Sequence, residues 1–449
     1  MQVSIAERLG NLPIGSWHWR LLALIGVGWA FDAMDTGIVS FVLPKLMTIW
    51  KLTPAQMGMI GSMGLIGMAV GAVFSGMVAD AIGRKKVLVA TLVIYGVATG
   101  ACGLSWNYES LLVFRFIVGF GLGGQMPVAV TLVSEYSPTK YRGRMIVLLE
   151  STWAIGWLAA ACISWLVIPT HGWEIAFYIG AFPAIWALYV YSKVPESVLY
   201  LMKKGRIDEA HEQVCQVERA LGVPCGEKPT SAEVSGAAKP SFTLGMLFTG
   251  PYLKKTVCLW ILWFGVMFSY YGIFLWLPSL LVKAGHTMVQ SFAFVLWMTL
   301  AQLPGYFTAA ALVDKVGRKP TLAAFLILCA GSAYMFGHSS SYNEILLWGC
   351  LMSFFNLGAW GLMYTYTPEM YPTAARATGT GWAGACGRVG GMLAPLVVGA
   401  LLTGPNAFTL IFGLFTGVLV VIALNVLVLG EETMNKSLDD SAASNSTAK

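Results

Sequence analysis

Apolar residues run along this chain in about twelve long stretches separated by short polar segments. Each stretch has roughly 17 to 27 residues, and a helix needs about 20 to cross the hydrocarbon core of a bilayer. Because backbone groups find no water there, only helices or closed barrels can span it. The pattern predicts an all-α membrane protein with twelve transmembrane helices over residues 20–46, 55–79, 87–104, 111–133, 145–168, 175–191, 257–282, 289–313, 321–337, 345–367, 378–403 and 408–429.

Composition supports the same class of protein. Of the 449 residues, 57% are hydrophobic and 11% are charged, whereas roughly a quarter of an ordinary soluble domain is charged. Most side chains therefore face the lipid bilayer or other helices. The first stretch is too long for the apolar region of a secretory signal, and no small-residue cleavage site follows it, so we expect it to be retained.

Lys and Arg residues indicate how the helices are oriented. Of the 28 basic residues, only Lys45, Lys51 and Lys283 fall in segments predicted to lie outside. The positive-inside rule therefore places both termini in the cytoplasm and the chain in the cell inner membrane. The net charge of +6 reflects this topology, and we expect no nucleic-acid partner.

The eight cysteines are dispersed, with no CxxC pair and no metal-like cluster. We expect free thiols, no disulfide framework, no structural metal and no cofactor. The sequence also lacks GxSxG, HExxH, P-loop and dinucleotide-binding fingerprints, so an enzyme is the weakest interpretation.

A polar stretch between the sixth and seventh spans predicts a division into two halves. We expect an N-terminal six-helix half over 1–191, a cytoplasmic linker over 192–255 and a C-terminal half over 256–430. The linker contains a predicted amphipathic segment, residues 205–221. The polar, low-complexity residues 431–449 predict a disordered cytoplasmic tail.

The chain also carries an internal repeat, because one offset of 234 residues aligns several uncommon residues. The aligned pairs are Asp80 with Asp314, Arg84 with Arg318, Glu135 with Glu369, and Arg142 with Arg376. A shared offset indicates duplication, so we expect two pseudo-symmetric halves that rock about a solute site at the membrane midplane.

Two copies of one loop carry a resemblance to a known family. Residues 76–86 read GMVADAIGRKK and residues 311–319 read ALVDKVGRK, similar to the GxxxDxxGR(K/R) loop of the major facilitator superfamily. The resemblance implies a cytoplasmic latch of Asp and Arg; the alternative is a topological anchor alone. The second copy has Ala310 where the leading Gly belongs, which puts close helix packing there in doubt.

The spacing of Glu and Arg in each half, and the PES sequence at 195–197, resemble the sugar-porter branch and its synaptic vesicle glycoprotein 2 relatives. That resemblance implies ion pairs that hold the cytoplasmic side shut, each contributing little energy when exposed. The implied gating residues are Asp80, Arg84, Glu135, Arg142, Asp314, Arg318, Glu369 and Arg376.

Charged residues inside the membrane are costly and are therefore functional candidates. Asp32 and Asp35 lie one turn apart in the first span, and Arg115 lies among glycines in the fourth. Resemblance to proton-coupled sugar porters implies that Asp35 and Arg115 are partners. A breakable pair is a natural proton switch, with Asp32 or Glu150 as other carriers; the alternative is a static structural ion pair.

Arg388, in the eleventh span, aligns with Ala154 at the repeat offset, so no symmetric scaffold role demands it. A buried, unmatched cation suggests an anionic ligand, because the planar guanidinium suits a carboxylate. Organic-anion transporters of the superfamily carry a similarly placed Arg. Alternatively, Arg388 neutralises Glu150, the other deep unmatched charge.

Aromatic residues supply candidates for contacting a flat ring. The alternative is that they fill the core or form interfacial belts. The tenth span places three residues at four-residue spacing on one face, and the seventh is rich in aromatics. The candidates are Asn356, Trp360, Tyr364, Tyr270, Tyr271, Phe274 and, beside Glu150, Trp153.

The runs FDAMDTGIVSFVLP, LPIGSWHWR and YYGIFLWLP resemble the bacterial niacin (nicotinate) transporter family. The resemblance implies import of nicotinate, a small aromatic carboxylate, by proton symport and alternating access in a functional monomer. An aromatic-acid proton symporter and a non-transporting solute sensor remain alternatives. A sugar porter is less favoured, because a buried Arg388 and Glu150 would burden a neutral ligand.

Overall fold

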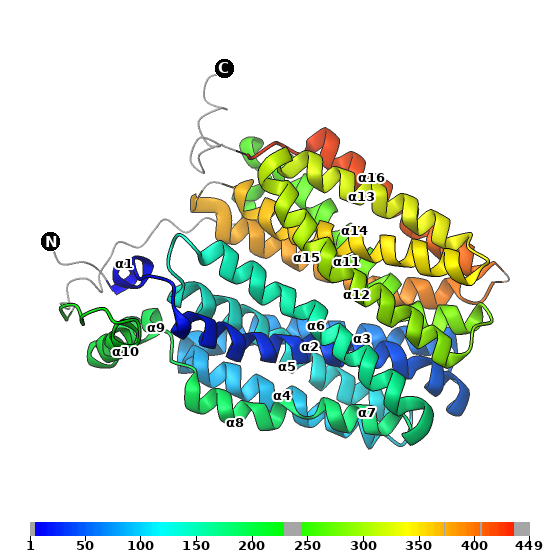
Figure 1. Ribbon diagram of the computed structural model, residues 1–449, viewed down its shortest axis with the longest axis horizontal. Coiled ribbons are helices and arrows are strands. Elements are labelled where there is room, and N and C mark those ends of the chain that lie inside the picture. The colour runs from blue at the N-terminus through cyan, green and yellow to red at the C-terminus, as the bar shows by residue number, and fades with distance from the viewer. Residues whose placement is uncertain (1–4, 229–243, 372, 405, 435–449) are drawn as a thin grey trace. The chain divides into compact units, whose positions relative to one another are not determined.

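The computed structural model describes residues 5–228, 244–371, 373–404 and 406–434. Within these residues, twelve helical spans are long and apolar enough to cross a membrane, which confirms the predicted all-α fold (Figure 1). The helices of these spans are α2 (Ser16–Ile49), α3 (Pro54–Ile82), α4 (Arg84–Gly103), α5 (Tyr108–Tyr136), α6 (Arg142–His171), α7 (Trp173–Gly180) with α8 (Pro183–Lys193), α11 (Gly250–Lys283), α12 (Met288–Val316), α13 (Arg318–Gly337), α14 (Tyr342–Glu369), α15 (Thr373–Leu401) and α16 (Ala407–Leu429).

The sixth span differs from its neighbours because it consists of two helices. Helix α7 ends at Gly180 and α8 begins at Pro183. Proline has no backbone N–H to continue a preceding helix, but its fixed φ suits the first turn of a new one. The break therefore follows from the position of Pro183.

Helices α4 and α13 begin with the same turn. Gly83 has φ +108° and Gly317 has φ +111°, and the two glycines are equivalent at the repeat offset. Only glycine adopts such a conformation at little cost. The duplication seen in the sequence thus extends to backbone geometry.

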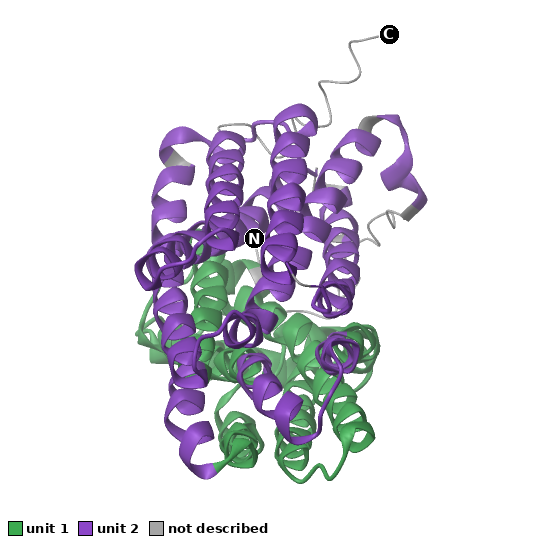
Figure 2. Cartoon of the chain, turned by 90° about the vertical axis from the view of Figure 1, so that its right-hand side faces the viewer, with its two compact units in different colours: residues 1–35, 66–160, 172–238 green, residues 36–65, 161–171, 239–449 purple. Residues whose placement is uncertain are grey.

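The chain forms two compact units, coloured separately in Figure 2. Unit 1 comprises residues 1–35, 66–160 and 172–238, and in it α4 packs against α5, α7 and α8. It also contains the short helices α1 (Ile5–Gly10), α9 (Val198–Lys203) and α10 (Ile207–Ala220). Helix α10 is the predicted amphipathic segment, and its apolar face is buried.

Unit 2 comprises residues 36–65, 161–171 and 239–449 (Figure 2). In it, α11 packs against α15 and α16, and α14 packs against α12 and α13. A short 3₁₀ helix, η2 (Leu244–Phe248), precedes α11. Helices α2, α3 and α6 contribute residues to both units; the predicted division into six-helix halves about 192–255 stays a prediction.

Two expectations were wrong. Cys215 and Cys225 are joined by a disulfide, whereas the other six cysteines are free, as expected. Gly222, with φ +73°, turns the chain back after α10 and brings Cys225 to Cys215. In addition, Glu431–Met434, predicted to be disordered, are held by hydrogen bonds described below. The rest of the predicted tail, 435–449, lies outside the described residues.

Candidate functional site

Asp35 of α2 and Arg115 of α5 form a buried ion pair in unit 1. Nη1 of Arg115 donates to Oδ2 of Asp35 over 2.8 Å, and Oγ1 of Thr99 donates to Oδ1 over 2.7 Å. Asp35 is 0% exposed and Arg115 is 4% exposed. Both carboxylate oxygens are therefore satisfied by partners from α4 and α5, as a buried charge requires.

Glycines let α5 approach its neighbour closely enough to support this pair. A Cβ on Gly121 would lie 2.7 Å from Cβ of Tyr95 in α4, closer than real Cβ contacts permit. Small residues in this way bring transmembrane backbones together. Gly121 is thus a packing feature of the α4 and α5 interface, whereas a Cβ on Gly123 would meet the backbone of Met68 in α3.

The other two acids proposed for proton transfer are also buried in unit 1. Asp32, one turn before Asp35, is 4% exposed and hydrogen bonds to Tyr95. Glu150 of α6 is 6% exposed, and the described part of unit 1 offers it no ion-pair partner. Trp153, one turn after Glu150, is 7% exposed. Both acids are thus buried as deeply as a role in proton transfer requires.

The predicted aromatic residues of α11 and α14 meet in unit 2. The rings of Tyr270 and Trp360 have centroids 4.9 Å apart, and those of Tyr271 and Trp360 are 6.5 Å apart. The ring centroids of Phe274 and Tyr270 are 4.9 Å apart, and those of Tyr364 and Trp360 are 6.0 Å apart. We call these five residues, with Trp263, the aromatic cluster.

Trp263 of α11 was missed by the sequence analysis. Its ring lies 4.9 Å from that of Tyr364, and its Nε1 donates to Oγ1 of Thr367 over 2.8 Å. Helical spacing could have identified it: Trp263 precedes Tyr270 by seven residues, about two turns, and so lies on the same face of α11.

Asn356 adds a polar group one turn from Trp360 on α14. It is 2% exposed, and its Nδ2 donates to Sγ of Cys329 over 3.7 Å. Its Oδ1 is buried with no hydrogen-bond partner among the described residues. The amide orientation is an assignment, so one end of this amide, donor or acceptor, is left to bond another group.

Arg388 lies on α15, the helix that packs against α11. A Cβ on Gly387 would be 3.1 Å from Cε3 of Trp263, and one on Gly391 would be 3.0 Å from Cδ2 of Tyr271. Because Arg388 and Gly391 are one turn apart, they share a side of α15 close to the aromatic cluster. Arg388 is half-buried, whereas the sequence analysis expected it to be buried.

The predicted gating residues of unit 1 form a hydrogen-bonded network at the start of α4. Nε of Arg84 lies 3.9 Å from Oε1 of Glu135, and Nη2 lies 3.3 Å from Oδ1 of Asp80. Ser197 donates to Oε2 of Glu135 over 2.6 Å and accepts from Nη1 of Arg84 over 3.2 Å. Glu196 accepts from the backbone N–H of Arg84 and Lys85 and so caps α4.

An equivalent network lies at the start of α13 in unit 2. Nε of Arg318 lies 3.1 Å from Oε2 of Glu369, to which Oγ1 of Thr433 also donates over 2.6 Å. Glu432 accepts from the backbone N–H of Arg318 and Lys319. The side chain of Asp314 lies outside the described ones.

Sequence reasoning missed Glu432 and Thr433 because the repeat offset aligns Glu196 with Gly430. The sequence did contain a clue: Glu432 and Thr433 repeat the acid–hydroxyl order of Glu196 and Ser197, two positions beyond the repeat offset. The two residues perform in unit 2 the contacts that Glu196 and Ser197 perform in unit 1.

The second Arg of each half has different surroundings in the two units. Nε of Arg142 is buried with no hydrogen-bond partner in the described chain, whereas Nε of Arg376 donates to the carbonyl of Pro368 over 3.0 Å. Glu135 and Glu369 bond Arg84 and Arg318.

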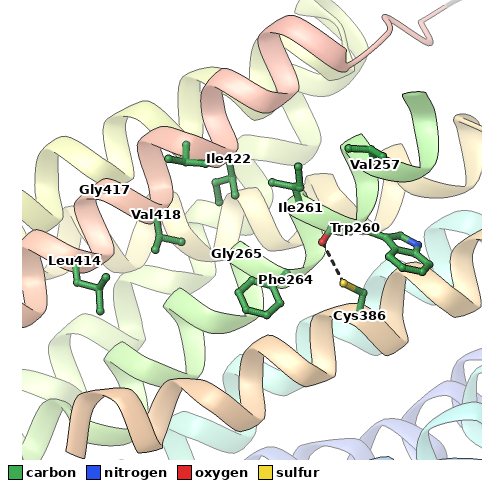
Figure 3. Close-up of a pocket in the computed structure, with 11 residues that line it drawn as sticks. Val257, Trp260, Ile261, Phe264, Gly265, Cys386, Leu414, Gly417, Val418 and Ile422 are labelled. Atoms are coloured by element: carbon green, nitrogen blue, oxygen red, sulfur yellow. Dashed lines mark hydrogen bonds between the residues drawn. The ribbon is translucent and has the colours of Figure 1, made fainter. Parts of the chain in front are cut away.

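An apolar pocket of about 700 Å³ lies among α11, α15 and α16 (Figure 3). Its lining includes Trp260, Phe264 and Val418 but none of the predicted substrate-binding residues. Val257, Ile261 and Val421 on its rim are exposed, so it opens where these spans would meet lipid. Because no charged side chain of the described residues lines it, this pocket does not suit a carboxylate.

Comparisons with known proteins find related transporters over nearly the whole chain. The profile of the family described as "Sugar (and other) transporter" matches residues 32–443. The niacin transporter NiaP of Acinetobacter baylyi is 55% identical over 97% of this chain and 99% of its own length. The putative niacin/nicotinamide transporter NiaP of Bacillus subtilis is 46% identical over 94% of this chain and 98% of its own.

Solved structures show the same fold. The xylose transporter XylE of E. coli in an inward-open conformation superposes with a TM-score of 0.76 at 18% identity, over 95% of this chain and 99% of that one. The family match and the niacin transporter relatives show a transporter of small organic solutes and not an enzyme, and the twelve membrane-capable helices show a multi-pass membrane protein. The chain belongs to the sugar (and other) transporter family of the major facilitator superfamily.

Proposed function

We propose that this protein imports nicotinate across the cell inner membrane by alternating access, coupled to protons. The observation that carries the substrate is the aromatic cluster beside Arg388. It fits the chemistry of a flat ring that bears one carboxylate. The 55% identity to a niacin transporter over nearly the whole chain supports the same substrate.

In this proposal each part of nicotinate has a partner. Arg388 holds the carboxylate through its planar donor fork, an interaction stronger than one between neutral groups. Tyr270, Tyr271 and Trp360 contact the ring face or edge. With its amide turned so that the nitrogen takes the unpartnered place now assigned to Oδ1, Asn356 donates to the ring nitrogen. Phe274 and Tyr364 complete the proposed lining in unit 2. Trp153, in unit 1, stays a prediction from the sequence.

The proton would act on the pair formed by Asp35 and Arg115. A nearby guanidinium favours the charged carboxylate, whereas burial favours the neutral acid. Protonation of Asp35 removes the charge that holds Arg115 and thus releases α5 from α2. Asp32 and Glu150, both buried, are the alternative carriers.

The two networks around Arg84 and Arg318 would act as gates. Each joins the start of one helix to the end of another through Glu135 or Glu369. Partly exposed pairs contribute about 1 kcal/mol or less. They can therefore bias the inward-facing against the outward-facing state without locking either.

Orientation follows from charge. The near absence of Lys and Arg from alternate loops supports a cytoplasmic location for both termini and α10. The protein would work as a monomer, with its substrate, protons and the bilayer as its partners.

The decisive experiment is uptake of radiolabelled nicotinate into proteoliposomes that contain the purified chain. We expect saturable uptake that an inward proton gradient stimulates and that excess unlabelled nicotinate abolishes. Uptake that does not respond to the gradient would support nicotinate as the substrate but reject proton coupling. Binding without uptake would indicate a solute sensor.

A second candidate is an aromatic-acid proton symporter. A benzoate transport protein of Acinetobacter baylyi is 28% identical over 90% of this chain and 87% of its own length. Arg388 and the aromatic cluster would also suit benzoate, which lacks only the ring nitrogen. A competition experiment separates the two candidates. Nicotinate uptake that excess benzoate does not inhibit supports the first proposal, and inhibition by benzoate as strong as that by unlabelled nicotinate supports the second. Nicotinamide, without a carboxylate, should compete weakly in both.

A further inference from the structure

A cluster of two cysteines, a histidine and an arginine lies outside the membrane-spanning helices, and the transport mechanism does not use it. Cys215 on α10 and Cys225 after it form a disulfide with a Cα separation of 4.9 Å. Cys215 is 1% exposed, whereas Cys225 is exposed. One sulfur of the pair is thus reachable from solvent, and the other is shielded behind it.

Two hydrogen-bond donors face the sulfur of Cys215. Nη2 of Arg8 lies 3.8 Å from it, and Nε2 of His211 lies 3.5 Å from it. Nη1 of Arg8 lies 3.3 Å from Nδ1 of His211. Because a guanidinium can only donate, Nδ1 accepts, and the neutral ring then carries its proton on Nε2, facing the sulfur. A cation and such a donor stabilise a thiolate.

His211, Cys215 and Cys225 also offer ligand atoms that all lie within 4.8 Å of one another, as a soft metal site would require. A metal bound at Nε2 of His211 would need the lone pair of that nitrogen. Because Nδ1 accepts from Arg8, the neutral ring carries its proton on Nε2, and this lone pair is not available. The metal would also need two separate thiolates, whereas the sulfurs are bonded. The arrangement therefore favours thiol chemistry over metal binding.

We propose that Cys215 and Cys225 are a reversible dithiol–disulfide pair, oxidised by a small disulfide of the glutathione type. The Cys225 thiolate attacks that disulfide, forms a mixed disulfide and expels one thiol. The Cys215 thiolate then attacks the sulfur of Cys225 and expels the second thiol. Two electrons pass to the oxidant, and the two protein protons end on the released thiols. In the cytoplasm, a disulfide of this kind is typically transient or redox-sensing.

The redox pair is joined to helix α1 through Arg8 and Glu218. Arg8 donates to Glu218 through Nε over 3.0 Å and Nη2 over 2.7 Å, and its Nη1 donates to the carbonyl of Glu227 over 2.8 Å. The N–H of Gly226 donates to the same Glu218 over 3.1 Å. Burial acts to raise the pKa of Glu218, but these hydrogen bonds outweigh it and leave the pKa lowered. The segment after Cys225 and helix α1 therefore share one carboxylate.

Helix α1 in turn contacts the loop between α5 and α6. The carbonyl of Gly10 accepts from the N–H of Thr139 over 2.9 Å, and Thr139 lies between Glu135 and Arg142. On α10, Gln213 bonds the hydroxyl of Tyr136 over 2.8 Å. Oxidation fixes residues 225–227 on α10 and secures α1 against this loop, whereas reduction loosens both. This regulatory step rests on the proposed function.

The first test reads the thiols without reference to transport. The full chain in lipid nanodiscs is equilibrated in mixtures of glutathione and glutathione disulfide, alkylated and analysed by mass spectrometry. We expect the labels on Cys215 and Cys225 to disappear together as the mixture becomes oxidising. Two labels in every mixture, or thiols protected by Zn²⁺ until a chelator is added, would overturn the redox pair.

Arg8→Gln tests the positioning of the thiolate. Without the cation beside its sulfur, Cys215 should close the disulfide about threefold more slowly, since lower thiolate content is partly offset by higher nucleophilicity. A glutathione adduct should then accumulate on Cys225. Arg219→Gln, an exposed change on α10, is the matched control. An unchanged rate in Arg8→Gln would remove Arg8 from the site.

The second test couples the pair to transport. Oxidised and reduced proteoliposomes should differ at least twofold in nicotinate uptake. Cys215→Ser/Cys225→Ser should abolish this difference, and Cys162→Ser, which changes a free cysteine of α6, should retain it. A disulfide that forms without altering uptake would reject the link to the gate, whereas no uptake in either state would reject the proposed substrate and leave the thiol result standing.

Discussion

Arg115 and Asp35, 80 residues apart in the chain, lie 2.8 Å apart through Nη1 and Oδ2 in the interior of unit 1. Thr99 binds the other carboxylate oxygen. Neutralising Asp35 therefore removes the only acid that the described residues pair with Arg115 by a salt bridge. This relationship makes proton coupling testable at one residue.

Asp35→Asn should keep nicotinate binding within about twofold but abolish stimulation of uptake by a proton gradient, because the amide carries no titratable proton. Uptake with and without the gradient checks this, and binding is measured separately by isothermal calorimetry. Asp32→Asn, one turn away, is the matched variant and should keep the stimulation. If Asp35→Asn still responds to pH, the proton carrier is Asp32 or Glu150.

Arg388→Ala should weaken nicotinate binding about 10- to 100-fold, since a hydrogen bond to a charged group contributes about 1.5–3 kcal/mol. Arg388→Lys should restore part of the affinity, because Lys keeps the charge and lacks the planar fork. Lys254→Ala removes an exposed cation from α11 and should change nothing. Unchanged affinity in Arg388→Ala would assign Arg388 to structure.

Trp360→Ala should weaken nicotinate binding about 3- to 10-fold by removing the central ring of the aromatic cluster, as aromatic contacts contribute about 0.5–1.5 kcal/mol. Trp360→Phe should lose less. The control is Trp297→Ala on α12, whose ring is 53% exposed. Equal losses from both alanine variants would indicate general destabilisation and not a ring-binding site.

Glu432→Gln should lower the free energy of unfolding at pH 7 by about 1 kcal/mol or less, because it removes a charged cap from α13. Burial acts to raise the pKa of Glu432, but four backbone N–H groups outweigh it and hold the pKa below its ordinary value. Its contribution is therefore complete above the unfolded pKa of about 4.3 and is lost as pH falls through the lowered folded value.

Thermal melting of the detergent-solubilised chain between pH 3 and 7 measures this effect. The wild type should lose stability on acidification, and Glu432→Gln should lose less over the same range. Glu212→Gln, on the exposed face of α10, should behave like the wild type. A melting curve for Glu432→Gln that matches the wild type at every pH would show that the cap contributes nothing.

Several site contacts could be predicted because each depends on local pattern or on a motif. The four-residue spacing of Asn356, Trp360 and Tyr364 places them on one helix face whatever the packing. The first-span and fourth-span motifs indicated Asp35 and Arg115 as partners, and the two form an ion pair. The role of each residue in transport stays a prediction.

Other contacts had no such pattern. The Cys215–Cys225 disulfide depends on the turn at Gly222, which reverses the chain after α10. Glu432 and Thr433 reach the start of α13 although they lie two residues beyond the repeat offset. A polar, low-complexity sequence predicts disorder, but a cap on another helix is a long-range contact that composition does not register.

By itself, the sequence determined the twelve spans and the duplication, because the length of each apolar run sets what can cross a bilayer and a shared offset reports a repeat. The class of transporter was implied by the resemblance of its motifs to a known family. Only the tertiary structure decided which charges meet, which rings touch and how far Arg388 is covered. Burial and pairing depend on neighbours from distant parts of the chain, and no local pattern encodes the distance between them.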